Sequence, residues 1–202
     1  MDSGNIGFVL LCAAFVFVMT PGLAMFYGGL VRKKNVVNTM MTSIFIIGVG
    51  IVMWVLFGYS LSFAPSGNAF IGDFRWLGLE GVSLTEGYTD DASIPNMVFS
   101  AFQMMFAVIT PALITGAVAG RMKFKSIFVF TIFWSLIVYY PLAHMVWGQG
   151  GLLGADGIGA LDFAGGDVVH ISSGVSALVL CILLGKRHDY EHSIYRIHNI
   201  PT

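Results

Sequence analysis

Charged residues are scarce in this chain: Asp, Glu, Lys and Arg together make up 10% of its 202 residues. Soluble domains average about 25%. Hydrophobic residues account for 56% of the chain, and the mean hydropathy is +0.82. The net charge of -1 shows no basic excess, so nucleic acid is a poor candidate partner. This composition excludes an ordinary soluble domain and predicts a protein surrounded by lipid.

Cysteine is also scarce. Cys12 lies near the start of the first apolar run and Cys181 near the end of the last, and five runs would place them at opposite membrane faces. A disulfide needs Cα atoms within about 7 Å, so we interpret both as buried apolar packing residues. A basic signal-peptide segment is missing from the N-terminus, and the run behind it is too long for a signal peptide. We expect that run to be the first span.

Five apolar segments are long enough to cross the hydrocarbon core, which takes roughly 20 mostly apolar residues. The sequence therefore predicts an all-α integral membrane protein with five transmembrane helices. The predicted spans cover residues 6–31, 36–63, 96–120, 126–147 and 162–185.

Lys and Arg are distributed unevenly between the connecting segments. Only Arg75 falls on one side of the predicted membrane, whereas the other side carries Arg32, Lys33, Lys34, Arg121, Lys123, Lys125, Lys186, Arg187 and Arg196. Cationic loops are retained in the cytoplasm, so we expect the N-terminus outside and residue 202 inside the cell membrane. A second five-helix unit would then insert upside down, as in inverted-repeat transporters. Residues 186–202 are expected to form a cytoplasmic loop leading to a sixth helix that this chain lacks.

Three ionisable residues lie within nine positions of the fifth predicted span, where such groups are costly. Asp162 would cap the start of the helix or, alternatively, attract a cation. His170 lies eight residues further on, about 12 Å deeper. It would be either a histidine hydrogen-bonded between helices or a pore-lining imidazole, which can donate and accept hydrogen bonds.

Aromatic residues mark the third and fourth spans. Phe102 and Phe106 lie one turn apart on one helix face, with Gln103 beside them. Such pairs are usually core or lipid-facing residues. Trp147 ends the fourth span at the expected outer interface. It would serve as an interfacial anchor or hold a cation against its indole face, worth about 1 to 2 kcal/mol.

Three stretches of this sequence resemble the ammonium transporter (Amt) family. They are the run Asp162 to Gly166 with Val168 to His170, the run Ala143 to Gly148, and the segment from Pro21 to Asn35. In that family each subunit has eleven spans, of which the first ten form two inverted five-helix repeats, and the subunits form homotrimers with one pore each. The resemblance implies that this chain is one inverted repeat of the 11-helix ammonium transporter fold.

The resemblance also implies an outer substrate site. Trp147 and Phe106 would belong to the outer ammonium site and its gate, with Phe102 and Gln103 close by. Asp162 would support that site. A second gate phenylalanine, a serine of the outer site and a partner histidine belong to later spans of the family and are not in this chain.

His170 would be the first of two pore histidines, and Asp167 stands where the family more often has an uncharged residue. The implied function is to recruit ammonium at an outer aromatic vestibule, deprotonate it, and conduct ammonia through a hydrophobic pore lined by His170. Neutral ammonia avoids most of the cost of moving a cation through hydrocarbon.

The implied partners are ammonium or ammonia, the lipid bilayer, other subunits of a homotrimer, and a cytoplasmic PII-type regulatory protein. Neither a cofactor nor a metal is expected. A membrane-embedded ammonium sensor would carry a signalling domain after its spans. A Rh-type gas channel tends to lack an outer cation site, so Trp147 argues against it. An intramembrane enzyme using Asp162, Asp167 and His170 would need a nucleophile or metal-ligand spacing that the sequence does not offer.

Overall fold

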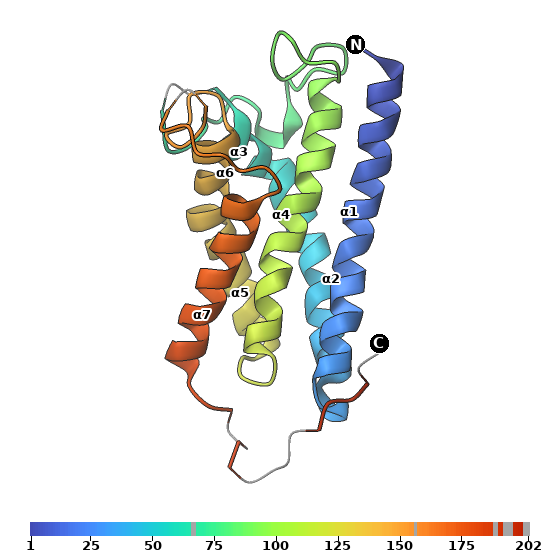
Figure 1. Cartoon of the computed structure of the whole chain (residues 1–202), viewed down its shortest axis with the longest axis vertical. Helices are drawn as coiled ribbons and strands as arrows, with labels where there is room; N and C mark the ends of the chain where they lie inside the picture. Colours follow the sequence, from blue (N-terminus) through green and yellow to red (C-terminus); the bar gives the residue numbers. More distant parts are fainter. Residues whose placement is uncertain (66–67, 156, 188–189, 192–195, 200–202) are drawn as a thin grey trace.

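The computed structural model describes residues 1–65, 68–155, 157–187, 190–191 and 196–199. These residues form helices and connecting loops, with no strand among them. Five helices are long and apolar enough to cross a membrane (Figure 1), and they run over Ser3–Leu30, Lys33–Phe63, Asn96–Val118, Phe124–Trp147 and Gly166–Leu184. The predicted all-α membrane fold is therefore confirmed.

Three of the five spans contain a π-helical turn, in which the hydrogen-bond ladder shifts by one residue. The first span is α1 (Ser3–Leu30) and the third is α4 (Asn96–Val118). The second span comprises α2 (Val36–Met53), the π turn Trp54–Gly58 and α3 (Tyr59–Phe63). The fourth span comprises α5 (Phe124–Trp134), the π turn Ser135–Tyr139 and α6 (Tyr140–Trp147). The fifth span comprises the π turn Gly166–Ile171 and α7 (Ser172–Leu184).

Several helix ends differ from the prediction by one to four residues, and glycine explains two of these differences. The fifth span begins at Gly166, four residues after Asp162, because Gly165 has a φ of 73° that a right-handed helix does not accept. The third span ends at Val118, and Gly120, with a φ of 72°, belongs to the turn that follows. His170 is therefore only about 6 Å along its helix, half the depth predicted.

Aromatic rings form the core where α3 and α6 meet. Trp54 lies 5.7 Å from Tyr59 and 6.1 Å from Tyr140, centroid to centroid, and Tyr59 lies 5.5 Å from Phe63. Tilted and edge contacts of this kind stabilise beyond their buried area. Gly58 allows the approach, because a Cβ there would lie 2.7 Å from the Tyr140 ring. The cluster holds α3 and α6 together beneath the loops at this end of the bundle.

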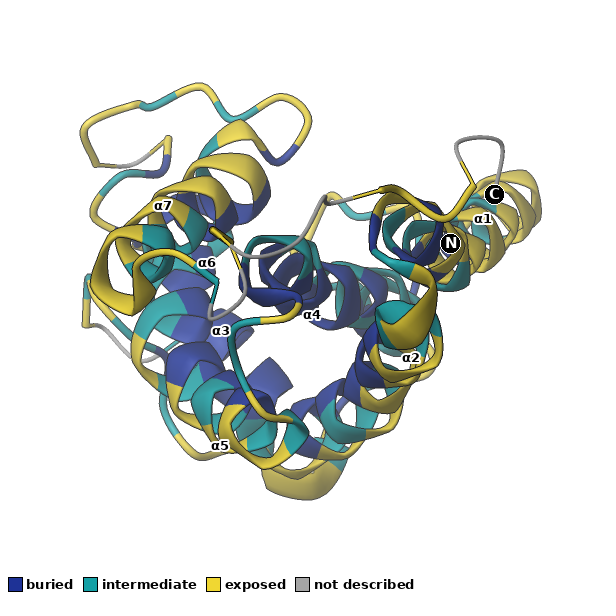
Figure 2. Ribbon diagram, turned by 90° about the horizontal axis from the view of Figure 1, so that it is seen from below, coloured by how far each residue is buried: buried dark blue, intermediate teal, exposed yellow. Residues whose placement is uncertain are grey.

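Helix α4 occupies the middle of the bundle and is the most buried of the five spans (Figure 2). Gly116 allows α1 to approach it closely, because a Cβ there would lie 2.6 Å from the ring of Tyr27. The Tyr27 hydroxyl donates a hydrogen bond to the Leu113 carbonyl at 2.9 Å. Side chains such as Phe8 and Phe15 on α1 are 67% and 66% exposed. Such an apolar surface is ordinary when lipid, rather than water, surrounds it.

The described segments that carry the nine clustered Lys and Arg residues lie together at one end of the bundle (Figure 1). Backbone N–H of His198 donates to the Val31 carbonyl at 2.9 Å, and Arg187 Nε donates to the Ala119 carbonyl at 3.1 Å. The loop between α3 and α4, whose sequence includes Arg75, lies at the opposite end (Figure 1). The prediction for residues 186–202 falls partly on 188–189, 192–195 and 200–202, which lie outside the described residues.

At the end opposite the basic cluster, Arg75 pairs with Asp73 at 2.7 Å. Hydrogen bonding from the guanidinium lowers the pKa of the Asp73 carboxyl.

Cys12 and Cys181 are free and half-buried, so the prediction that both are buried is wrong. Cys12 lies on α1, which packs on one side only, and Cys181 lies near the end of α7. The thiol of Cys181 contacts the Ala117 carbonyl at 3.5 Å. Both cysteine side chains are therefore partly exposed at the surface of the bundle.

Candidate functional site

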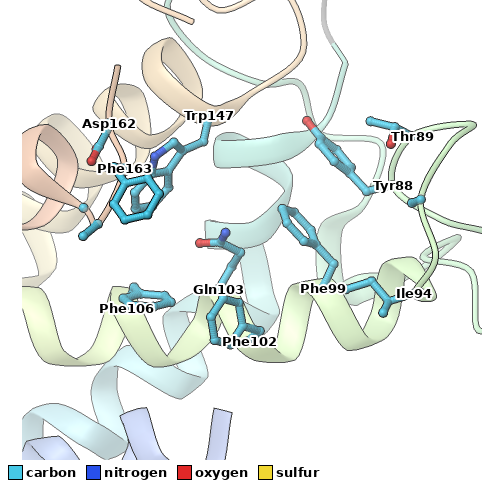
Figure 3. A pocket seen from close by; sticks show the side chains of 13 residues that line it. Tyr88, Thr89, Ile94, Phe99, Phe102, Gln103, Phe106, Trp147, Asp162 and Phe163 are labelled. Carbon is cyan, nitrogen blue, oxygen red and sulfur yellow. The ribbon is translucent and has the colours of Figure 1, made fainter. Parts of the chain in front are cut away.

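A cavity of about 680 Å³ lies between the first half of α4, the end of α6 and the loop that precedes the fifth span. Figure 3 shows that its lining is mainly aromatic. The rings belong to Tyr88, Phe99, Phe102, Phe106, Trp147 and Phe163. Gln103 and Asp162 add polar groups to this lining. The cavity thus combines π faces with an amide and a carboxylate at the end of the bundle opposite the basic cluster.

Helix α4 contributes one stripe of residues to the cavity. Phe99, Phe102, Gln103 and Phe106 recur at spacings of three and four and so lie on one face of the helix. The rings of Phe102 and Phe106 meet edge to face, with centroids 5.0 Å apart and planes at 85°. The pairing predicted from sequence therefore exists, and it faces a cavity. Phe99 extends the same stripe by one turn, so its spacing could have identified it.

Trp147 is the last residue of α6, and its side chain lines the cavity. Its ring centroid lies 6.4 Å from that of Phe106, with the planes at 66°. One turn earlier, buried His144 places Nδ1 3.1 Å from the Ser62 carbonyl and Nε2 2.8 Å from the Asn68 carbonyl. These contacts connect α6 to α3 and to the chain that follows it, and so hold the end of α6 that carries Trp147.

Asp162 folds back onto the start of the fifth span. Its Oδ1 accepts a hydrogen bond from the Gly166 N–H at 2.6 Å, and its Oδ2 accepts one from the Val168 N–H at 3.2 Å. The capping role expected from sequence is therefore present, although Asp162 lies in the loop before the helix. The carboxylate also meets the positive end of the helix dipole. Asp162 can influence the cavity through its charge and through the path of the loop that it holds.

The Gln103 amide points into the space between Trp147 and Phe99 (Figure 3). Its Oε1 is buried and receives no hydrogen bond from the described residues. An unsatisfied buried acceptor costs about 1–3 kcal/mol. A guest that donates a hydrogen bond in this cavity would remove that cost.

His170 is exposed and does not line the cavity. Its Nδ1 lies 2.9 Å from the Gly165 carbonyl, which can only accept, so Nδ1 carries the proton and a neutral ring would present Nε2 as an acceptor. The structure thus brings together five residues singled out from the sequence, namely Trp147, Phe106, Phe102, Gln103 and Asp162, and leaves His170 about one turn along the fifth span. Asp167, in the same turn as His170, is half-buried.

Tyr88 is a cavity residue that the sequence did not reveal, because it lies in a long polar loop without periodicity. Its ring stacks on Phe99, with centroids 4.9 Å apart and planes at 6°. The hydroxyl accepts a hydrogen bond from the Gln149 N–H at 3.0 Å. Burial raises the pKa of the Tyr88 hydroxyl to about 12, so the phenol stays uncharged at neutral pH. Among the described residues, no group of three or more His, Cys, Asp or Glu could hold a metal ion.

Comparison with known proteins gives a consistent result across sequence and structure. The family model of the Ammonium Transporter Family matches residues 7–202. An ammonium transporter of Bacillus subtilis (strain 168) is 53% identical over 189 residues, which cover 94% of this chain and 46% of that protein. This chain therefore spans about half the length of the curated relatives that it matches.

Solved structures agree with this assignment. The crystal structure of Saccharomyces cerevisiae Mep2 is 35% identical with a TM-score of 0.85, and the match covers 100% of this chain and 45% of that one. A structure named Sensor Amt Protein is 28% identical with a TM-score of 0.80, covering 98% of this chain and 49% of that one. Since the family model matches nearly the whole chain and the helices superpose on those of its relatives, the chain belongs to the ammonium transporter family.

Proposed function

We propose that the protein containing this chain transports ammonium across a membrane and that the aromatic cavity is its outer recruitment site. Family membership supports the substrate. The observation that carries the assignment of the site is the meeting of Trp147, Phe106 and Gln103 in one cavity with Asp162 in its wall. These four groups come from three separate segments of the chain.

The chemistry of the cavity suits a small cation that donates hydrogen bonds. Ammonium would lie against the π faces of Trp147 and Phe106, each contact worth about 1 to 2 kcal/mol when partly desolvated. Its N–H groups would satisfy the buried Oε1 of Gln103. The negative charge of Asp162 would favour the cation, while backbone N–H bonds to both of its oxygens hold the carboxylate in place.

Beyond the cavity, we propose that ammonium loses its proton and that ammonia continues along a hydrophobic path lined by His170. Desolvating an isolated cation in hydrocarbon costs many kcal/mol, whereas neutral ammonia avoids most of that cost. With Nδ1–H bonded to the Gly165 carbonyl, Nε2 of His170 would accept a hydrogen bond from ammonia.

Orientation, assembly and regulation are part of the same proposal. The basic end would face the cytoplasm and the cavity would then open outside; the clustering of basic residues at one end supports this orientation. The family resemblance implies a homotrimer in the cell membrane and a cytoplasmic PII-type regulatory partner.

An ammonium sensor is the second candidate, because the structure named Sensor Amt Protein shares this fold. Transport is preferred since identity to the Bacillus subtilis transporter is 53%, against 28% to the sensor. The aromatic cavity with Trp147 argues against a Rh-type gas channel.

The test uses the complete protein that contains these residues, reconstituted in vesicles. An inward ammonium gradient should produce a saturable current or internal pH change, and an equal sodium gradient should not. Absence of an ammonium-dependent signal, in vesicles where the Bacillus subtilis transporter is active, would contradict transport. Ammonium binding without flux would favour the sensor.

A further inference from the structure

An apolar groove of about 600 Å³ lies between α2 and α5, separate from the aromatic cavity. All nine of its lining residues are apolar or glycine. Figure 2 shows α2 and α5 at the periphery of the bundle. Helix α5 meets α7 only beyond the groove, where Trp134 Nε1 donates a hydrogen bond to the Ser176 hydroxyl at 2.8 Å. None of the residues assigned to ammonium recruitment lines this groove, so its role is independent of what enters the aromatic cavity.

The groove exists because α2 has no side chain at its centre. A Cβ built on Gly48 meets no atom within 4 Å. Met41 and Val52, seven residues before and four after Gly48, lie on the same helical stripe and are 53% and 57% exposed. Phe128 and Ile132 of α5 form the opposite wall. The groove therefore opens outward, to the surroundings of the bundle.

The length of the groove matches one leaflet of a bilayer. From Met41 to Val52 the helix rises about 16 Å, and half of the hydrocarbon core is about 15 Å thick. A hydrocarbon chain suits both the length and the wholly apolar lining of this groove.

Positive charge lies at one end of the groove. Lys125 is exposed and lies three and seven residues before Phe128 and Ile132, so it shares their stripe on α5. The ring of Phe45 packs against α5 near that end, with edge contacts to Phe128 at 5.6 Å and Phe124 at 5.0 Å. Among the residues that the structure describes, this end of the bundle carries nine basic side chains and one acidic one, Glu191. A headgroup above the groove would therefore meet positive charge.

We propose that this groove binds an anionic phospholipid from the leaflet at the basic end of the bundle. One acyl chain lies along α2 past Gly48, and the headgroup phosphate pairs with Lys125. The hydrocarbon supplies packing and the ammonium group of Lys125 supplies selectivity for negative headgroups, since a basic residue near an anionic membrane surface is worth about 1 kcal/mol.

The test uses the complete protein in phosphatidylcholine vesicles containing a trace of phosphatidylglycerol with a photoreactive diazirine in its acyl chain. After irradiation, peptides from 41–53 and 124–134 should carry the label. Unlabelled phosphatidylglycerol should compete about fivefold better than phosphatidylcholine, the factor that corresponds to ~1 kcal/mol. This measurement needs no variant.

Two variants and their matched controls locate the contacts. Gly48→Leu fills the groove and should abolish labelling of α2, whereas Gly22→Leu, where a new Cβ also meets no atom within 4 Å, should leave it unchanged. Lys125→Gln should remove most of the headgroup preference, and Lys123→Gln, at the residue before α5, should not. The proposal is overturned if α2 and α5 stay unlabelled, which would mean that another protein segment covers them. Equal competition by both lipids would overturn it too.

Discussion

Replacing Trp147 tests the aromatic recruitment site most directly. In the complete protein, Trp147→Leu keeps an apolar side chain but removes the indole face beside Phe106, whose centroid lies 6.4 Å away. The lost cation–π interaction is worth about 1 to 2 kcal/mol, which corresponds to a roughly 5- to 30-fold weaker affinity. The ammonium concentration giving half-maximal current should rise by that factor, and the maximal current should change less.

The control is a second tryptophan at the same end of the bundle. Trp76 stacks on Tyr59, with centroids 5.4 Å apart and planes at 15°, and it does not line the cavity. Trp76→Leu therefore removes an aromatic contact of similar size from outside the cavity, where Trp76 meets the lining only through an edge contact with Tyr88 at 6.4 Å. It should lower thermal stability and leave the half-saturating concentration unchanged. Equal concentration dependence in wild type and Trp147→Leu would refute the recruitment role and reduce Trp147 to an interfacial anchor.

Four further outcomes follow from the structure. Gln103→Met, which keeps the length but removes the buried acceptor, should raise the half-saturating ammonium concentration about tenfold or more, and an unchanged value would exclude a direct hydrogen bond. His170→Ala should lose most ammonium-driven current while His170→Asp keeps flux but admits potassium; wild-type selectivity in both would place the pore elsewhere. Gly165→Ala should lower stability by about 1–2 kcal/mol in thermal melts because of the φ of 73°, whereas Gly174→Ala, in open space, should not. Because the pKa of Tyr88 is raised, its neutral form contributes stability that is complete below pH 10 and is lost as the pH rises through about 12. Thermal melts of Tyr88→Phe should therefore lose less stability over this pH range than melts of the wild type.

Local sequence patterns were sufficient for much of the fold. Apolar length alone predicted the five spans, because crossing the hydrocarbon core imposes a minimum run of apolar residues. The spacing of Phe102 and Phe106 correctly placed both on one face of α4, since helical periodicity is local. Asp162 was correctly interpreted as a cap from its position before an apolar run. The start of the fifth span was predicted less accurately from the sequence. The helix begins at Gly166, because Gly165 adopts a left-handed conformation.

Only the tertiary structure decided which of these residues meet. Trp147 and Phe106 are 41 positions apart, and Tyr88 comes from a loop with no periodic pattern, yet all three line one cavity. The groove at Gly48 likewise depends on α5 lying beside α2. In the sequence alone, a glycine at this position would fit close helix packing as well as it fits a groove. Hydropathy and spacing describe each helix separately, whereas a cavity is the space left between helices. Its shape depends on how side chains from distant segments pack, and no single segment contains that information.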